Sequence, residues 1–232
     1  MRIVILQPSY LPWLGYFDQM SKSDAFVIYD DVQYDKNGWR NRNRIKTARG
    51  PQWLTVPVLI KGRHSPRNRE VEINNTVAWR TKHLRSIAQN YSKTPYFTPT
   101  MDLVRSILER PWRLLLDLNM AFIRMIAERL ELNTRIYFSS DLDITPCGKT
   151  QRLIEICRRF GADTLLEGAA GKNYIDEDLF TCAKIRLEYH DYRHPRYCQL
   201  HGEFISYLSI VDLLFNHGKD SLAILTGQKL VS

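Results

Sequence analysis

Residues 2–6, Arg-Ile-Val-Ile-Leu, form a short apolar, β-branched run that stops at Gln7 and Pro8, and residues 25–29, Ala-Phe-Val-Ile-Tyr, form a second one. Apolar runs of this length that end at a polar loop are typical of buried parallel strands. Residues 15–23, between the two runs, have the composition of a short helix. The order strand, loop, helix, strand is a βαβ unit, and it predicts a fold built around a parallel sheet.

The rest of the chain repeats this pattern after an interruption. Helical spacing predicts a helical insertion at about residues 76–131, and residues 52–59 are predicted as an irregular or edge strand because they contain Pro57. Further strands are predicted at 134–138, 163–167 and 185–189, and further helices at 148–160, 176–183, 206–216 and 221–225. We expect one domain, residues 1–232, of the α/β class, with a parallel doubly wound sheet that binds ligands at the carboxyl ends of its strands.

Composition and charge narrow the classes of protein. The 232 residues are 44% hydrophobic, which is enough for a substantial core. The apolar run at the amino terminus is too short for a signal peptide or a membrane span, so we expect a cytoplasmic protein. A net charge of +8 indicates an anionic partner, and nucleic acid, nucleotide and sugar phosphate all remain open. The cysteines have no metal-binding or disulfide spacing, so we expect free thiols at Cys147, Cys157, Cys182 and Cys198.

The loop after the first predicted strand is the most distinctive segment. Two prolines fix its path, and Gly15 permits close backbone approach at the start of a helix, where phosphate can bind to free N–H groups. A rigid turn with aromatic packing is the alternative, and the residues alone do not separate the two. The residues predicted from this loop to bind a ligand are Gln7, Pro8, Tyr10, Trp13, Gly15 and Tyr16.

The second distinctive segment follows the second strand and changes from acidic to basic. Carboxylates such as Asp30 and Asp31 suit sugar hydroxyls or a divalent cation held with phosphates, and a solvated turn is the alternative. Arginines at alternate positions would share one face of a strand and form a focused anion site, although a solvated basic hairpin or a contact with nucleic acid would have the same composition. The ligand-binding residues predicted here are Asp30, Gln33, Trp39, Arg40, Asn41, Arg42, Asn43 and Arg44.

The later loops supply the remaining candidates. Lys149 stands just before a predicted helix and could reach a phosphate, although its surroundings lack the upstream glycine of a P-loop. His194 is a candidate general acid or base because an unperturbed imidazole titrates near neutral pH. The irregular spacing of His190, His194 and His201 argues against a zinc site. We therefore predict catalytic roles for Asp31, Lys149 and His194, no bound structural metal, and ligand contacts from Ser139, Ser140, Glu167, Gly168, Gly171 and Tyr174.

Four segments carry a resemblance to a known family. They are QPSYLPWLGYFDQ (7–19), YDDVQYDKNGWRNRNRI (29–45), KTQRLIEICRRFGADTLLEGAAGKNYIDEDLF (149–180) and YLSIVDLLFNHG (207–218). Together they resemble the WbqC-like family over nearly the whole chain. That resemblance implies a role in the biosynthesis of bacterial surface polysaccharides such as O-antigen, with transfer of an aminoacyl group to an amino sugar.

A more distant resemblance concerns architecture. A strand, a loop that ends in glycine at a helix start, and a later polar loop are similar to the nucleotidyltransferase, or HUP-like, and class I synthetase folds. Those folds hold ATP phosphates with a His-x-Gly-His motif, whereas Trp13-Leu14-Gly15-Tyr16 keeps the glycine and neither histidine.

The leading hypothesis from the sequence is a transferase or ligase that uses ATP or another nucleotide, with Mg²⁺ as an accompanying ion. It would join an amino acid or other acyl donor to a nucleotide-linked sugar. A nucleic-acid-binding module that uses Trp39 and Trp53 as stacking surfaces, which we favour less, and a non-catalytic scaffold of polysaccharide assembly are the alternatives.

Overall fold

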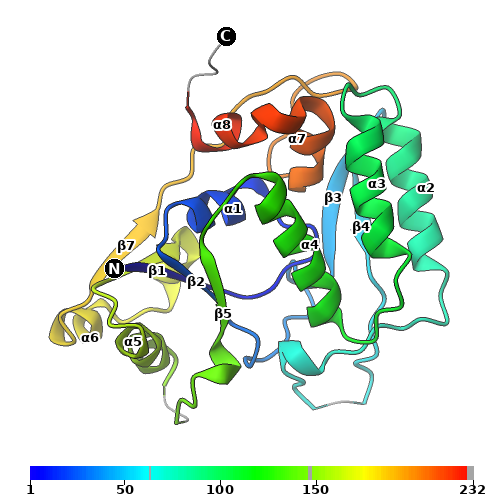
Figure 1. Ribbon diagram of the computed structural model, residues 1–232. Coiled ribbons are helices and arrows are strands. Elements are labelled where there is room, and N and C mark those ends of the chain that lie inside the picture. Colours follow the sequence, from blue (N-terminus) through cyan, green and yellow to red (C-terminus); the bar gives the residue numbers. More distant parts are fainter. Residues whose placement is uncertain (63, 146–147, 229–232) are drawn as a thin grey trace.

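The structure is a computed structural model that describes residues 1–62, 64–145 and 148–228 (Figure 1). Within these residues, the central sheet has five strands, all parallel, in the order β5-β2-β1-β6-β7. Their bounds are β1 (Arg2–Leu6), β2 (Ala25–Ile28), β5 (Arg135–Phe138), β6 (Thr164–Gly168) and β7 (Arg186–His190). The direction of the strand order reverses between β1 and β6, which makes the sheet doubly wound and confirms the predicted parallel α/β class.

Both faces of the sheet are covered by helices, which explains why its strands are apolar on both sides. Val4 and Phe26 pack on one face, in the same core as α1, whereas Ile3 and Val27 pack on the other face with α5 and α6. Successive side chains of a strand point to opposite faces, so one apolar run serves two cores. The helices are α1 (Leu14–Ser21), α5 (Lys149–Arg159) and α6 (Glu177–Cys182).

The chain leaves the sheet after β2 and first forms an antiparallel hairpin of β3 (Arg42–Thr47) and β4 (Gly50–Thr55). The predicted strand at 52–59 is thus shifted, and it belongs to a separate two-stranded sheet. Pro57 lies beyond the end of β4, whereas Pro51 lies within β4, opposite Lys46. Gly50 adopts a φ of +100° where β4 begins, a conformation that glycine tolerates and other residues rarely adopt.

The helical insertion follows the hairpin, as predicted. Its helices are α2 (Trp79–Tyr91), α3 (Phe97–Leu108) and α4 (Leu115–Arg129), and the chain ends with α7 (Ile210–His217) and α8 (Ser221–Thr226). Short 3-10 turns occur as η1 (Asn68–Glu70), η2 (Ser139–Asp141), η3 (Ala169–Asn173) and η4 (Gly218–Asp220). In Figure 1, α2 and α3 lie beside the hairpin and α7 lies above it. None of the described helices is long and apolar enough to cross a membrane.

The insertion shares one core with the first face of the sheet. Side chains of β1, α1, the hairpin, α2 to α4 and α7 all belong to a single cluster of buried apolar residues. Residues 191–209, which we call the C-terminal strap, connect β7 to α7 without a helix or strand. That the whole chain is one domain stays a prediction.

Three cysteines can be placed. Cys157 is buried, Cys182 and Cys198 are exposed, and none of these three is in a disulfide. Burial raises the pKa of the Cys157 thiol to about 12, so it stays protonated. Cys147 lies outside the described residues.

Candidate functional site

The ends of β2 and β5 are joined by two aspartates and two serines. Asp30 is buried, and its carboxylate accepts hydrogen bonds from the Ser140 amide at 3.1 Å and the Ser140 hydroxyl at 2.8 Å. The Ser139 hydroxyl lies 2.6 Å from a carboxylate oxygen of Asp31. These four predicted site residues therefore lie together at the carboxyl edge of the sheet, where ligands of such sheets bind.

Asp31 is also paired with an arginine that the predicted set omits. Its carboxylate forms a salt bridge with Arg152 of α5, and both side chains are largely buried. The guanidinium carbon of Arg152 lies 5.8 Å from the centre of the Tyr29 ring. These contacts join α5 to the end of β2 through Asp31, and the catalytic role of Asp31 stays a prediction. Lys149 lies one turn earlier, exposed at the first position of α5.

Glu167 lies at the carboxyl end of β6, next to the switch point with β1. Its buried carboxylate accepts hydrogen bonds from the Gly168 amide at 3.0 Å and from the Tyr174 hydroxyl at 3.4 Å. Burial raises the pKa of Glu167 to about 7, although these two hydrogen bonds oppose the increase. Gly171 makes room for this side chain, because a Cβ there would lie 2.4 Å from Glu167 Cγ. A carboxyl group that titrates near neutral pH has the property required of a general base.

The loop before the insertion covers the ends of β1 and β2. The Asn68 amide donates to Oε1 of Gln7 at 3.1 Å and to the Tyr29 carbonyl at 3.3 Å. Gln33 is exposed and donates to the Ser65 hydroxyl at 3.3 Å. Gln7 therefore lies at the predicted edge, whereas Gln33 contacts the covering loop.

The first loop is buried rather than open. Tyr10 is inaccessible to solvent, its hydroxyl lies 2.9 Å from Nδ1 of His83, and its ring packs edge-on against Phe122. Pro8 is also buried, and its carbonyl accepts a hydrogen bond from Arg40 at 3.5 Å. These contacts account for Pro8 and Tyr10 as packing residues, the alternative that the sequence left open.

Gly15 is covered by an aromatic ring of its own loop. A Cβ at Gly15 would lie 2.2 Å from the Trp13 indole, and that indole packs edge-on against Tyr192. Tyr16 is buried beside Phe26 of β2, with ring centres 5.1 Å apart. The Trp13 ring thus fills the space over Gly15, where the sequence predicts a bound phosphate.

The two asparagines of the basic segment hold backbone together. The Asn41 amide donates to the Val56 carbonyl at 2.8 Å, and the Asn43 amide donates to the Leu11 carbonyl at 2.7 Å. Both side chains are buried. They fix the hairpin to the segment after it and to the first loop.

The three arginines of this segment divide into two groups. Arg40 precedes β3 and donates to the Ser9 hydroxyl at 3.0 Å, so it contacts the first loop. Arg42 and Arg44 lie at alternate positions of β3 and share one face of it. Trp39, with 40% of its surface exposed, lies near this face. The expectation of one face for all three arginines is therefore wrong for Arg40, because the chain turns before the strand starts.

His194 lies in the C-terminal strap, surrounded by aromatic rings. Its Nδ1 donates to the Pro195 carbonyl at 3.0 Å, and its ring lies within 6.0 Å of the rings of Tyr192, Phe204 and Tyr207. Burial lowers the pKa of His194, and the hydrogen bond to Pro195 opposes this change. Its contacts are to the strap itself, whereas Asp31 and Lys149 belong to the carboxyl edge.

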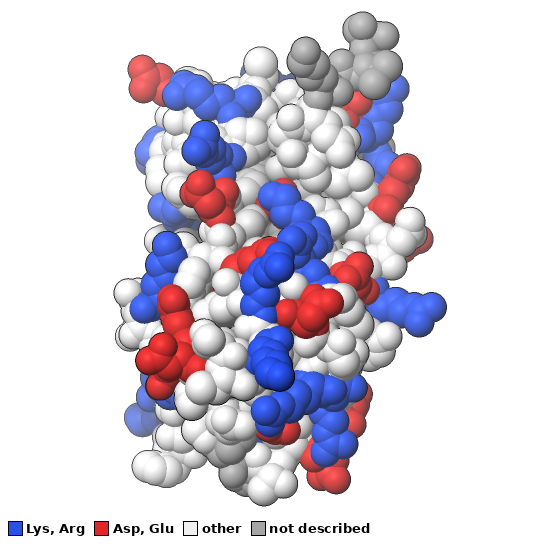
Figure 2. Space-filling model, turned by 90° about the vertical axis from the view of Figure 1, so that its left-hand side faces the viewer, with Lys and Arg blue, Asp and Glu red and all other residues white. Residues whose placement is uncertain are grey.

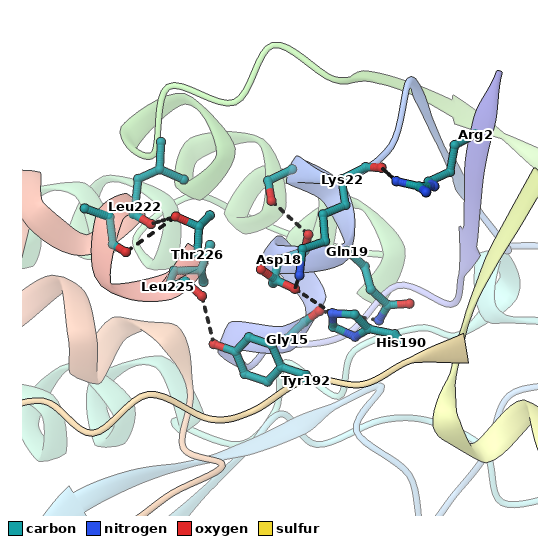
Figure 3. A network of polar contacts seen from close by, with 12 residues as sticks. Arg2, Gly15, Asp18, Gln19, Lys22, His190, Tyr192, Leu222, Leu225 and Thr226 are labelled. Atoms are coloured by element: carbon teal, nitrogen blue, oxygen red, sulfur yellow. Dashed lines mark hydrogen bonds and ion pairs between the residues drawn. The ribbon is translucent and has the colours of Figure 1, made fainter. Parts of the chain in front are cut away.

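A buried charged network lies under the strap (Figure 3). Asp18 of α1 accepts hydrogen bonds from His190 Nε2 at 2.5 Å and from Lys22 Nζ at 2.6 Å. The His190 ring stacks on Tyr192, whose hydroxyl donates to the Leu225 carbonyl at 3.3 Å. The network joins α1, the end of β7, the strap and α8.

The two ends of the carboxyl edge differ in the groups that they offer to a metal ion or to a phosphate. The carboxylates of Asp30 and Asp31 are engaged by serines and Arg152, and among the described residues no group of three or more His, Cys, Asp or Glu could hold a metal ion. A phosphate fits better at the start of α5, because a helix N-terminus and the exposed Lys149 both favour an anion.

Sequence reasoning missed Arg152, Asn68 and the Asp18–His190 pair. Arg152 had a usable signal, because residues three apart on a helix share a face and Lys149 was already a candidate. Asn68 and His190 had none, since their partners are 61 and 172 residues away in the chain.

The fold and the edge define the class: a doubly wound parallel α/β protein with a polar carboxyl edge and a near-neutral carboxyl group beside its switch point. The WbqC-like protein family model matches residues 7–224, and the chain belongs to that family. It is also 41% identical, over 95% of each chain, to a protein of Mycobacterium tuberculosis (strain ATCC 25618 / H37Rv) that carries the name "Uncharacterized protein Rv1507c". No solved structure matches.

Proposed function

We propose that this protein is an ATP- or nucleotide-dependent transferase or ligase that adds an aminoacyl or other acyl group to an amino sugar. The sugar would be nucleotide-linked, and the setting would be the synthesis of bacterial surface polysaccharide such as O-antigen. The observation that carries the proposal is Glu167, a buried carboxyl group with a pKa of about 7 beside the switch point of the sheet. Membership of the WbqC-like family supports the setting.

The proposed chemistry assigns one role to each residue of the edge. As the sugar amine attacks the carbonyl carbon of the ATP-activated acyl group, a C–N bond forms and the bond from that carbon to the phosphate oxygen breaks, so that phosphate or nucleoside monophosphate leaves. Glu167 takes up the proton that the amine nitrogen releases. The Tyr174 hydroxyl, 3.4 Å from the same carboxylate oxygen, orients it. Lys149 and the start of α5 would hold a phosphate, and ATP, together with Mg²⁺, would supply the activation of the acyl carboxylate.

The arrangement also supports a nucleotidyltransferase-like, or HUP-like, site with a changed phosphate contact. The order β5-β2-β1-β6-β7 places the reversal of the sheet between β1 and β6. The first loop has no His-x-Gly-His motif, and its Trp13 ring covers Gly15. We therefore assign the phosphate contact to Lys149 rather than to the first loop.

The test is Glu167→Gln, with the exposed Glu128→Gln as the control. With ATP, an amino acid panel and UDP-linked amino sugars, mass spectrometry of the amide product measures kcat/KM. Loss of a general base should lower kcat/KM by about 100-fold or more in Glu167→Gln. The acid limb of the pH profile, near pH 7, should disappear. An unchanged rate and an unchanged limb would refute the role of Glu167.

A stability measurement tests the same residue without any substrate. Because the pKa of Glu167 is raised from 4.5 to about 7 by folding, the protein loses stability as pH rises through this window. This difference in pKa corresponds to about 3 kcal/mol in the free energy of unfolding, at 1.36 kcal/mol per pKa unit. Glu167→Gln should therefore gain stability relative to the wild type between pH 5 and pH 8. An equal pH dependence in the two proteins would contradict the raised pKa.

A further inference from the structure

Two exposed tryptophans lie against two arginines. Trp39 and Trp53 have 40% and 46% of their surface exposed. Arg42 and Arg44 lie on the same face of the hairpin, and Trp53 of β4 is directly opposite Arg44. We call these four residues the Trp–Arg platform.

The two indole rings of the platform are tilted toward each other, and the guanidinium groups lie over them. The ring centres of Trp39 and Trp53 lie 5.3 Å apart at an angle of 34°. The guanidinium carbon of Arg42 lies 4.8 Å from the centre of Trp53, and that of Arg44 lies 5.7 Å and 5.6 Å from Trp39 and Trp53. Planar cations on indole rings form a flat surface that is both aromatic and positive.

Backbone carbonyls fix the orientation of both arginines. One terminal nitrogen of Arg42 donates to the Asn37 carbonyl at 2.6 Å, and one of Arg44 donates to the Tyr207 carbonyl at 3.2 Å. Each guanidinium group keeps further N–H donors, since it has five in total. A ligand would meet donors that are already ordered, which lowers the entropic cost of binding.

The charge of the platform distinguishes it from other basic surface of the protein. On the face that carries β7, basic and acidic side chains are interspersed (Figure 2), and Arg2 and Arg186 both pair with Glu188, at 2.8 Å and 3.8 Å. In the part of the chain that the structure describes, Arg42 and Arg44 have no carboxylate within salt-bridge distance. Among the described residues, neither of these two positive charges is thus paired with a carboxylate in a salt bridge.

We propose that the Trp–Arg platform binds a nucleoside diphosphate, the nucleotide part of the sugar acceptor. This inference rests on the proposed function for the identity of the substrate. Two guanidinium groups match the charge of a diphosphate, and the exposed indoles offer a stacking surface for the base. The two indoles form one platform rather than a row, which suits a single base better than a nucleic acid strand.

The experiment is a titration of the full chain with UDP, ADP, inorganic diphosphate and an oligothymidylate, followed by tryptophan fluorescence and calorimetry. UDP or ADP should bind more tightly than inorganic diphosphate, because the base adds stacking. Arg44→Ala and Arg42→Ala should each weaken nucleotide binding by about tenfold or more, the loss expected for a charge-assisted contact. Arg49→Ala, which removes an exposed arginine of the same hairpin, is the matched control and should bind within about twofold of the wild type.

Equal binding by the wild type and Arg44→Ala, or no binding of UDP and ADP, would overturn the proposal. Tighter binding of the oligothymidylate with a steep salt dependence would overturn it in favour of a nucleic-acid surface.

The platform and the proposed chemistry can fail independently of each other. If nucleotides bind through Arg44 but no acyl product forms, the platform stands and the proposed function falls. If product forms with an unchanged KM in Arg44→Ala, the platform falls and the proposed function stands.

Discussion

The first loop with α1, residues 7–21, and the hairpin region, residues 39–55, begin with similar sequence signals but have opposite environments. Each combines aromatic residues with hydrogen-bonding or charged side chains after a strand of the sheet. In the loop and α1, Tyr10 and Asp18 have no more than 1% of their surface exposed, whereas Trp39 and Trp53 of the hairpin region are 40% and 46% exposed. Aromatic and polar residues that follow a strand are therefore open to solvent only where later segments leave them uncovered.

The covering segments come from far along the chain. The strap and α7 contact the first loop, since Ile210 donates its amide to the Pro12 carbonyl at 2.9 Å. The face of the hairpin that holds Asn43 is buried, and the face that holds Arg42 stays open at Trp53. One face of the hairpin therefore serves the core, whereas the other is open at Trp53 and covered at Lys46, which is buried.

The largest stability effect should come from Asp18→Ala. Burial would raise the pKa of Asp18, but hydrogen bonds from His190 and Lys22 outweigh it and lower the pKa. Removal of the buried carboxylate leaves His190 without its hydrogen-bond partner and Lys22 without its ion-pair partner, which costs about 3 kcal/mol, so the Tm should fall by roughly 10 °C. Differential scanning calorimetry at pH 7 measures this, with the exposed Asp102→Ala as the control. The difference should shrink as pH falls through the lowered pKa. A Tm loss no larger than that of the control would show that the network contributes little.

The second effect is a pH dependence that arises at His83, which contacts the first loop through Tyr10. Burial lowers the pKa of His83 from 6.5 to about 4. The stability that this neutral histidine contributes is complete above pH 6.5 and declines as pH falls toward 4, by about 3 kcal/mol. Urea unfolding at pH 7 and pH 4.5 should show a smaller decline for His83→Gln than for the wild type. His64→Gln, at an exposed site, should decline like the wild type, and equal declines in all three proteins would exclude His83 as the source.

The third effect concerns the ring over Gly15. Gly15→Ala places a methyl group 2.2 Å from the Trp13 indole, which packs against Tyr192. Overpacking of this kind costs about 1 to 3 kcal/mol. Gly168→Ala is the control, because a Cβ there meets nothing within 4 Å. Chemical denaturation of both variants decides the matter, and equal stability would show that Trp13 moves aside freely.

The smallest stability effect should be that of Arg42→Ala. Its charge lies on a solvent-facing strand surface, and changes of this kind usually alter stability by less than about 0.5 kcal/mol. The Tm should therefore change by no more than about 2 °C, while nucleotide binding weakens. Arg42→Lys should restore little binding, because an ammonium group lacks the planar guanidinium face. A large Tm loss with unchanged affinity would make Arg42 a structural residue and remove the contrast between the two regions.

The strands of the sheet could be predicted closely because most of them contain a short apolar run, although β7 reads Arg-Leu-Glu-Tyr-His. The predicted strand at 163–167 is β6 at Thr164–Gly168, and the predicted strand at 134–138 is β5 at Arg135–Phe138. The hairpin was harder to predict, because β3 reads Arg-Asn-Arg-Ile-Lys-Thr and has few of the β-branched residues that are typical of strands. Its strand pattern depends on a partner strand and on Asn43, whose amide finds its acceptor in the first loop.

The contacts of the candidate site residues could likewise be predicted only in part. That Asp30, Asp31 and Ser139 lie near one another followed from the sequence, because the ends of parallel strands meet at one edge. That Asp31 is paired with Arg152 did not follow, since the pairing depends on how α5 packs.

By itself, the sequence determined the α/β class, the parallel strands and the helical insertion, because these depend on local apolar periodicity. Only the tertiary structure decided which aromatic and basic residues face solvent, since burial is set by segments distant in the chain. Trp13 lies over Gly15 and against Tyr192 of the strap, whereas Trp53 lies beside Arg42 in the open. The tertiary structure also decided the raised pKa of Glu167, because desolvation by the residues packed around it causes that increase.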